Sequence, residues 1–452
     1  MRAKWLIITI LLAFSACAPT LSEVPRPAPV PDPSEEIQVV GADRASIIND
    51  LSAAINGAES DEPRLTEWMR IEQDIAGRAL IAGNRIDLLK DGPQTFESMF
   101  EAMREARHHI HLETFIIDDE SVGSELADIL IERRRDGVEV RMVYDSFGAL
   151  NTEDAYFARL RENGVELHHF HPVNPIENIQ IWRVNNRHHR KIVVVDGKIG
   201  FIGGINISAT YSSSSVSSAR GPDQGWRDTQ IKVEGPGVAQ LQEIFTRFWL
   251  DETGAPLEGG DYFPHLGDAG KDLTRVVHST GGDAEADIYH VYLTAIEHAR
   301  QKIWITQGYF SPDERFLTAL QAAAERGVDV RLLLPGMTDS WITINSSRNH
   351  YSMLLEKGIR IFERKDALQH AKTALIDGIW STIGSTNLDY RSFLHSNEAN
   401  IVIWGRGFGS KMEETFLEDQ AKNQEIKFED WHRRSWMQRA IESLANMFKY
   451  WL

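Results

Sequence analysis

The sequence predicts an α/β protein built from two copies of one lobe, each a mixed β-sheet flanked by helices. Short apolar runs alternate with amphipathic segments, which is typical of strands covered by helices. The same order of segments occurs twice, with Gly137 and Gly327 190 residues apart and His189 and His370 181 residues apart. Each copy also carries the same pattern of polar residues, so we expect the two lobes to share one plan.

The chain begins with a segment typical of targeting. Arg2 and Lys4 precede a short apolar run, Trp5 to Phe14, which is too short to span a membrane as a helix. Cys17 follows and is the only cysteine of the chain, so no intramolecular disulfide is possible. This start resembles a bacterial lipoprotein signal, which implies cleavage before Cys17 and lipidation of its thiol. A plain secretory signal or an uncleaved anchor is the alternative.

The remaining chain divides by composition and pattern. A stretch rich in Pro and acidic residues reads as an extended linker, and a helical segment leads into the first lobe. The predicted divisions are the signal at 1–17, the linker at 18–42, the helical segment at 43–82, the lobes at 83–265 and 266–428, and an amphipathic tail at 429–452.

Within the first lobe, we expect strands at His109 to Ile117 and Val138 to Asp145, with an amphipathic helix at Ser124 to Gly137 between them. A further helix and strand follow, and the second lobe repeats this order from about Lys302. Because helices separate these strands, the pattern predicts mainly parallel pairing, with hairpins at the motif strands described next.

Each lobe holds a His, a Lys two residues later, an Asp five residues after that, and a Gly-rich return that ends in Asn. The first copy comprises His189, Lys191, Asp196 and Asn206, and the second comprises His370, Lys372, Asp377 and Asn387. On a strand, residues two apart face the same side, so each His lies alongside its Lys. An Asp-Gly pair between apolar runs predicts a hairpin that returns the Asn towards the His.

Two His, two Lys and two Asn in one place suit phosphodiester chemistry. A neutral imidazole can attack phosphorus, and a protonated imidazole can deliver a proton to the leaving oxygen. Ammonium groups and amides can neutralise charge that develops on the other phosphate oxygens. This chemistry requires no cofactor and no metal. The remaining His residues lack Cys partners and a recognised ligand spacing, so the sequence predicts no metal site.

Both motifs resemble the phospholipase D superfamily signature, H-x-K-x4-D followed by a Gly-rich turn and Asn. The resemblance implies a covalent phosphohistidine intermediate and a site at the pseudo-twofold interface of the lobes. Further segments are similar to bacterial cardiolipin synthases, namely Trp226-Arg227-Asp228-Thr229, Glu234-Gly235-Pro236, Tyr309 to Asp313 and Ser396-Asn397-Glu398. By the habit of that family, His189 is the nucleophile and His370 the general acid and base.

Four acidic residues remain to be placed. Asp228 and Glu398 each follow a motif His by a few tens of residues, and we expect each to hydrogen-bond an imidazole and fix its tautomer. Asp196 and Asp377 belong to the motif and are counted with the catalytic set. The alternative is that they only form turns, although they would still shape the site.

Lys and Arg number 48 against 66 Asp and Glu, a net charge of −18, which counts against a general nucleic-acid binder. We expect a phospholipid substrate, phosphatidylglycerol, from the resemblance, and a bacterial envelope location facing the periplasm. Ala18 after the lipidated Cys favours the outer membrane by analogy. The tail, with Trp and Arg residues at helical spacing, either lies at a lipid interface or packs as an ordinary helix on the globule.

The predicted function is therefore that of a phosphatidyltransferase, which converts two phosphatidylglycerol molecules to cardiolipin and glycerol. A lipid-hydrolysing phospholipase D, or less readily a nuclease, uses the same chemistry with water as the acceptor. A catalytically silent lipid-binding protein of the envelope is an alternative of another class, against which two complete motifs argue.

Overall fold

The structure is a computed structural model that describes residues 37–56, 62–172, 185–213, 225–257, 260–282 and 286–451. The predicted signal with Cys17 and most of the predicted linker lie outside these ranges.

The first lobe contains three neighbouring parallel strands. These are β3 (His109–Thr114), β4 (Glu139–Asp145) and β5 (Glu166–Phe170), which are parallel because α5 (Ser121–Arg135) and α6 (Asp154–Glu162) return the chain between them. The other elements of this lobe are β2 (Leu80–Leu89), α4 (Gly92–Arg104), β6 (Arg187–His188), β7 (Ile192–Val195), β8 (Ile199–Gly203), β9 (Gln230–Glu234) and α7 (Val238–Thr253).

The second lobe repeats this order. Its parallel strands are β11 (Lys302–Thr306), β13 (Asp329–Pro335) and β14 (Arg360–Arg364), with α9 (Glu314–Glu325) in the first crossover. Two helices, α10 (Trp341–Asn349) and α11 (Tyr351–Leu355), fill the second crossover. The other elements are β10 (Asp272–Ser279), α8 (Asp287–His298), β12 (Phe310–Ser311), β15 (Thr373–Ile376), β16 (Trp380–Gly384), β17 (Leu388–Asp389), α12 (Tyr390–Leu394), β18 (Ser396–Trp404), α13 (Arg406–Lys422), β19 (Gln424–Ile426), α14 (Phe428–His432) and α15 (Trp436–Asn446).

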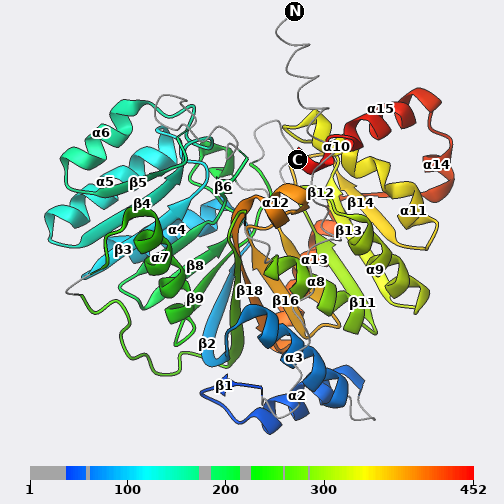
Figure 1. The fold of residues 1–452 in the computed structure, drawn as a ribbon, viewed down its shortest axis with the longest axis horizontal. Helices are drawn as coiled ribbons and strands as arrows, with labels where there is room; N and C mark the ends of the chain where they lie inside the picture. The colour runs from blue at the N-terminus through cyan, green and yellow to red at the C-terminus, as the bar shows by residue number, and fades with distance from the viewer. Residues whose placement is uncertain are drawn as a thin grey trace, which may run out of the picture.

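One mixed sheet runs through both lobes (Figure 1). In each lobe the first parallel strand pairs antiparallel with a motif hairpin, β7–β8 or β15–β16. The sheet continues through β9 or β18, and antiparallel pairing of β2 with β10 joins the halves. The predicted α/β fold with duplicated lobes is thus confirmed. Most parallel pairing lies among the three strands of each lobe that helices join, with short parallel pairs of β1 (Val39–Val40) with β2, β6 with β18 and β12 with β17, and the hairpins and their returns are antiparallel.

The two turns of these hairpins match the sequence prediction. Asp196 and Gly197 have φ of 54° and 63°, and Asp377 and Gly378 have φ of 51° and 71°. Two successive residues at positive φ form the tight turn that Asp-Gly favours, because its twist matches that of the paired strands.

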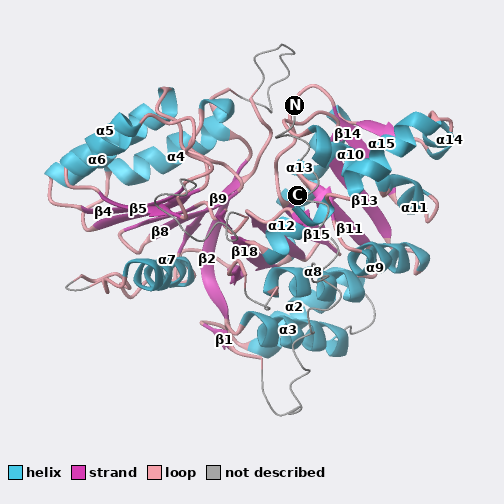
Figure 2. Cartoon of the chain, turned by 45° about the horizontal axis from the view of Figure 1, so that its top comes forward, coloured by secondary structure: helices cyan, strands magenta, loops and turns pink. Residues whose placement is uncertain are grey.

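Helices cover both faces of the sheet in each lobe (Figure 2). In the first lobe α4, α5 and α6 bury their apolar sides with β3, β4 and β7, whereas α7 packs on the opposite face. In the second lobe α8 and α9 lie on one face and α13 on the other. Ile, Val, Leu and Phe side chains make up most of these layers, and full burial of each contributes about 2 kcal/mol.

The predicted N-terminal helical segment forms α2 (Arg44–Asn56) and α3 (Glu62–Ala76), preceded by the short β1 (Val39–Val40). In Figure 1 both helices lie at the lower end of the molecule, where α3 packs on α8. Glu72 of α3 is fully buried and accepts hydrogen bonds from Arg275 and from the indoles of Trp380 and Trp404. A buried carboxylate with these partners fixes α3 to the second lobe.

Among the described residues, none of the helices combines the length and the apolar character needed to cross a bilayer.

Candidate active site

The first motif lies at the edge of the sheet where the parallel strands end. β7 runs antiparallel to β3, with Ile192 opposite Glu113 near the end of β3. The residues just before β7, His189 and Lys191, therefore lie beside the carboxyl ends of the parallel strands. Open α/β sheets bind their ligands at this edge.

The second motif repeats this placement, because β15 pairs antiparallel with β11 in the same way. His370 and Lys372 precede β15. In both motifs the ammonium group of the Lys donates to the carbonyl oxygen of its own His, with a distance of 2.6 Å from Lys191 Nζ to His189 O. The predicted pairing of each His with its Lys is thus made through the backbone.

The imidazole of His189 is held by a carboxylate from the other lobe. β6, in the first lobe, pairs in parallel with the start of β18, in the second. The amide of His189 donates to the carbonyl of Asn397 at 3.0 Å, which places the next residue, Glu398, beside the ring. Nδ1 of His189 lies 2.9 and 3.1 Å from the two carboxyl oxygens of Glu398.

The imidazole of His370 is held in the equivalent way by a carboxylate of the first lobe. Its amide donates to the carbonyl of Arg227 at 2.7 Å, and an isolated bridge links Arg227 to Gln369. The next residue, Asp228, lies with one carboxyl oxygen 2.7 Å from Nδ1 of His370. Asp228 and Glu398 thus bond to imidazoles as the sequence suggested, but each bonds to the His of the opposite lobe.

This exchange has a chemical consequence. A carboxylate that accepts from Nδ1–H fixes the tautomer in which Nε2 keeps its lone pair. An imidazole acts as a nucleophile or a base through this lone pair. Because each imidazole is completed by the other lobe, neither lobe holds a full site alone.

Burial and like charges set the protonation of the site. Burial, together with the neighbouring ammonium groups, lowers the pKa of His370 to about 4 and the pKa of His189 well below its ordinary range. Burial also lowers the pKa of Lys191 to about 7 and of Lys372 to about 8. The pKa of Glu398 is raised to about 8 by burial, against the opposing charge of Lys191. Both imidazoles are therefore neutral before a ligand binds.

Three aromatic side chains that the sequence prediction did not include in the site surround His370. The hydroxyl of Tyr211 lies 3.0 Å from His370 Nδ1, and the rings of Trp226 and Tyr309 lie 5.3 and 6.0 Å from the imidazole. His370 is correspondingly the less exposed of the two motif imidazoles, at 5% of its side chain against 12% for His189.

The two motif Asn residues differ. Asn206 accepts from the amide of Ile116 at 3.0 Å and donates to the hydroxyl of Tyr211 at 3.2 Å. Its side chain therefore positions Tyr211, while the phosphate-binding role stays a prediction. Asn387 is buried, and its Oδ1 has no hydrogen-bond partner among the described residues.

The position after the first parallel strand distinguishes the two halves. In the first lobe, the ring of Phe115 lies 4.9 Å from the ring of His189 and 5.1 Å from Lys191 Nζ. The corresponding residue in the second lobe is Gly308, where a Cβ atom would lie 3.0 Å from Lys372 Nζ. The second half thus needs glycine to make room for its Lys.

Asp196 and Asp377 lie at the opposite ends of the motif strands from the His residues. β7 spans four residues, about 13 Å at about 3.3 Å each. The Asp196 carboxylate accepts from the backbone amides of Arg107, His108 and His109. The Asp377 carboxylate accepts from those of Arg300, Gln301 and Lys302 and pairs with Arg64. We therefore correct the catalytic role predicted for both: these carboxylates fix the hairpin turn to the start of a parallel strand.

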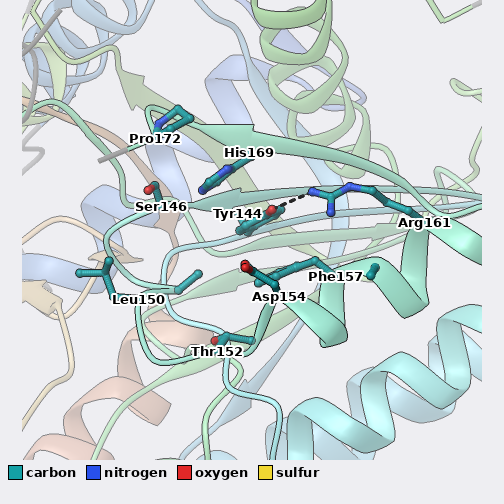
Figure 3. Close-up of a pocket in the computed structure, with 11 residues that line it drawn as sticks. Tyr144, Ser146, Leu150, Thr152, Asp154, Phe157, Arg161, His169 and Pro172 are labelled. Carbon is teal, nitrogen blue, oxygen red and sulfur yellow. Dashed lines mark hydrogen bonds between the residues drawn. The ribbon is translucent and has the colours of Figure 1, made fainter. Parts of the chain in front are cut away.

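A cavity of about 450 Å³ lies beside the site in the first lobe, between β4, β5 and α6. Figure 3 shows Tyr144 at its centre, where Arg161 donates to the Tyr144 hydroxyl at 3.1 Å. The Tyr144 ring is stacked between Phe157 and His169. The motif His residues do not line this cavity. Asp145, which lies between the lining residues Tyr144 and Ser146, is buried and accepts from the amide of His188 at 2.7 Å, and His188 precedes the motif residue His189.

Within the described ranges, no cluster of His, Cys, Asp or Glu side chains suits a metal ion. His109 and His111 contact Gln242, and His111 also stacks on Phe245 at 4.2 Å.

The family model described as "Cardiolipin synthase, PLD-like domain" matches residues 99–249 and 292–420, one segment in each lobe. A cardiolipin synthase of Halalkalibacterium halodurans is 35% identical over 382 residues, which cover 84% of this chain and 74% of the relative. A cardiolipin synthase of a Geobacillus species is 37% identical over 370 residues, which cover 80% of this chain and 71% of the relative.

The fold also has a solved counterpart. A phosphatidylserine synthase of Haemophilus influenzae superposes with a TM-score of 0.65 at 14% identity, covering 85% of this chain and all of that one. This similarity concerns the fold. Together with the sequence matches, it confirms the predicted resemblance: the chain belongs to the cardiolipin synthase family of phospholipase D-like proteins.

Proposed function

We propose that the protein is a phosphatidyltransferase that makes cardiolipin and glycerol from two molecules of phosphatidylglycerol. The main support is that His189 pairs with Glu398 and His370 with Asp228, each across the two lobes, in a chain that is similar to cardiolipin synthases. Two imidazoles with fixed tautomers beside two ammonium groups provide a nucleophile, a proton carrier and charge stabilisation.

In the proposed first step, Nε2 of His189 attacks the phosphorus of one phosphatidylglycerol. The bond from phosphorus to the glycerol headgroup oxygen breaks, and His370 gives that oxygen a proton. The bound phosphodiester raises the pKa of His370, because its negative charge favours the imidazolium. We assign the attack to His189, since it is the more exposed of the two rings.

Glu398 and the two Lys residues support the intermediate. The positive charge that forms on the phosphorylated imidazole favours the ionised form of Glu398, which accepts a hydrogen bond from Nδ1–H and stabilises that charge. Lys191 and Lys372 neutralise the phosphate oxygens. A hydroxyl of the second phosphatidylglycerol then loses its proton to His370 and attacks phosphorus, which forms cardiolipin and frees His189.

The product test uses purified protein in mixed micelles with labelled phosphatidylglycerol, and resolves the products by mass. We expect cardiolipin and glycerol in equal amounts, with neither formed by the His189→Ala variant. Phosphatidic acid without cardiolipin would reassign the protein as a lipid hydrolase. Absence of both lipid products would refute phosphatidyl transfer.

We further propose that the protein is held in the bacterial envelope, facing the periplasm, by a lipid on Cys17, with the C-terminal tail as a second membrane contact. The start of the sequence supports the first part, because a basic pair and a short apolar run precede a lone Cys. Labelling of cells with a fatty acid should mark the protein, whereas the Cys17→Ser variant should remain unlabelled. A labelled Cys17→Ser protein would contradict this site of lipidation.

A further inference from the structure

Helix α15 packs on the globule with its polar side. Ser346 of α10 donates to Asn446 at 3.2 Å, and Ser443 donates to Asn349 at 3.3 Å. Glu442 is buried and bonds to Arg434. An amphipathic helix that belongs to a soluble core buries its apolar side instead.

The apolar side of α15 is consequently exposed. Trp436 is 78% exposed, and Met437, Leu444 and the following Met447 are each more than half exposed. At 100° per residue, these four residues and Ala440 fall within one arc of about 100°. The sequence therefore builds a continuous apolar stripe, and the fold directs it away from the protein.

The amino end of α10 extends this stripe. Because Ser346 pairs with Asn446 and Asn349 with Ser443, α10 and α15 run antiparallel. The amino end of α10 therefore lies beside the carboxyl end of α15, and its exposed apolar residues are Trp341 and Ile342, with Met337 just before the helix. We call the exposed apolar side chains of 337–342 and 436–447 the docking face.

Basic residues accompany the docking face. Residues 429–451 contain Arg433, Arg434, Arg439 and Lys449 against Glu429, Asp430 and Glu442, a small positive excess in a chain whose net charge is −18. Arg433 pairs with Asp430 and Arg434 with Glu442, so Arg439 and Lys449 supply that excess. Arg433 and Arg439 are exposed. A positive charge beside exposed Trp, Met and Leu fits the interface of an anionic bilayer, in which apolar side chains enter the acyl boundary and basic ones contact the headgroups.

The docking face lies on the side of the molecule that holds the site. α10 follows β13, so it begins at the carboxyl edge of the parallel strands. The corresponding loop of the first lobe, after β4, exposes Phe147 and Leu150. In Figure 1, α6, α10 and α15 lie along the upper side, opposite α2 and α3. Contact through these residues would turn the site edge towards the lipid.

We propose that the docking face is an interfacial binding surface for an anionic phospholipid bilayer, which it contacts without crossing. The proposal deepens the proposed function by identifying how the site meets its lipid, and rests on that function only for the choice of phosphatidylglycerol. The occupant is a bilayer rather than another protein, because the face combines a helical apolar stripe with a basic rim.

A single-cysteine probe tests this in the full chain. Cys17 is the only native cysteine, so the Cys17→Ser, Leu444→Cys variant carries one thiol for a polarity-sensitive fluorophore. The matched control is Cys17→Ser, Leu250→Cys, at an exposed Leu of α7. With phosphatidylglycerol vesicles we expect about a twofold rise in emission at 444 and quenching by acyl-chain nitroxides, with neither at 250. Phosphatidylcholine vesicles should bind at least about tenfold more weakly.

Equal responses at 444 and 250 would overturn the proposal. So would a rise at 444 with protein concentration alone, because that result assigns the face to a second copy of the chain. The readout needs no turnover, so loss of cardiolipin formation with a normal probe response would refute the proposed function and leave the docking face supported. In the reverse case, normal synthesis without a probe response would refute the docking face and the C-terminal tail as a membrane contact, and leave the proposed transfer reaction supported.

Discussion

Glu398 and Asp228 each govern an imidazole that belongs to the other lobe. Both are fully buried, and their distances to Nδ1, 2.9 and 2.7 Å, are those of well-formed hydrogen bonds. These carboxylates act through His189 and His370 and are positioning residues. Because their partners cross the interface, a defect in one lobe disables the imidazole of the other.

At the residue scale, we predict that Glu398→Gln lowers kcat by roughly 100-fold or more, because an amide no longer selects the Nδ1–H tautomer. The variant should also shift the pH profile of kcat, which a purely structural role would not move. Glu363→Gln is the matched control, since Glu363 is a buried carboxylate paired with Arg348 at 2.9 Å. Equal kcat values in the two variants would contradict the positioning role.

At the scale of elements, each motif hairpin has a reactive end and an anchored end. The His and Lys precede the first strand, whereas the Asp lies in the turn and accepts backbone amides. For Asp196→Asn we therefore predict a free energy of unfolding lower by about 1–3 kcal/mol, with kcat changed only a few-fold. Denaturant unfolding and micelle kinetics would measure both quantities. A loss of kcat as large as that of His189→Ala, with stability unchanged, would restore the catalytic assignment.

The N-terminal helices are a second element whose role was not readable from the sequence. Glu72→Ala should lower the free energy of unfolding by about 3–5 kcal/mol, because Arg275 is left buried without its partner. Glu67→Ala, at an exposed position on the same helix, provides the control. If the two variants unfold at the same denaturant concentration, α3 is not fixed to the second lobe in the way described.

At the scale of the whole molecule, we expect buried and half-buried His residues to set the acid stability. Burial lowers the pKa of His109, His350, His370 and His395 to about 4 and that of His278 to about 3. The unfolded chain binds protons at these residues below about pH 6.5, and the folded protein does not. The free energy of unfolding should therefore fall as pH falls from 6.5 to 4, by up to about 1.4 kcal/mol per pH unit for each such His.

Denaturant titrations across this range would show the fall, and His350→Gln should reduce its slope by about one proton. Stability that rises as pH falls from 6.5 to 5 would contradict the buried, neutral state of these residues.

The repeated motif was enough to predict the lobes, the hairpins and both His-Lys pairs, because these features depend on local spacing. Glu398 and Asp228 could be identified as partners, but their exchange between lobes depends on the pairing of β6 with β18 and of Arg227 with Gln369. Such long-range contacts leave no periodic trace in the sequence. The three aromatic side chains around His370 were not predicted for a similar reason. Tyr211 and Trp226 lie between β8 and β9 of the first lobe, whereas Tyr309 follows β11 of the second.

In the proposed mechanism, His189 forms the covalent intermediate while His370 carries the proton. The most direct test of this assignment uses a phosphatidyl ester of p-nitrophenol, whose leaving group needs no proton. We predict that His370→Ala releases one nitrophenol per protein and retains the phosphatidyl group on His189, since the base for the second step is missing. His189→Ala should give no burst. A burst in His189→Ala with none in His370→Ala would contradict the assignment, and steady release without an adduct in either variant would contradict covalent catalysis.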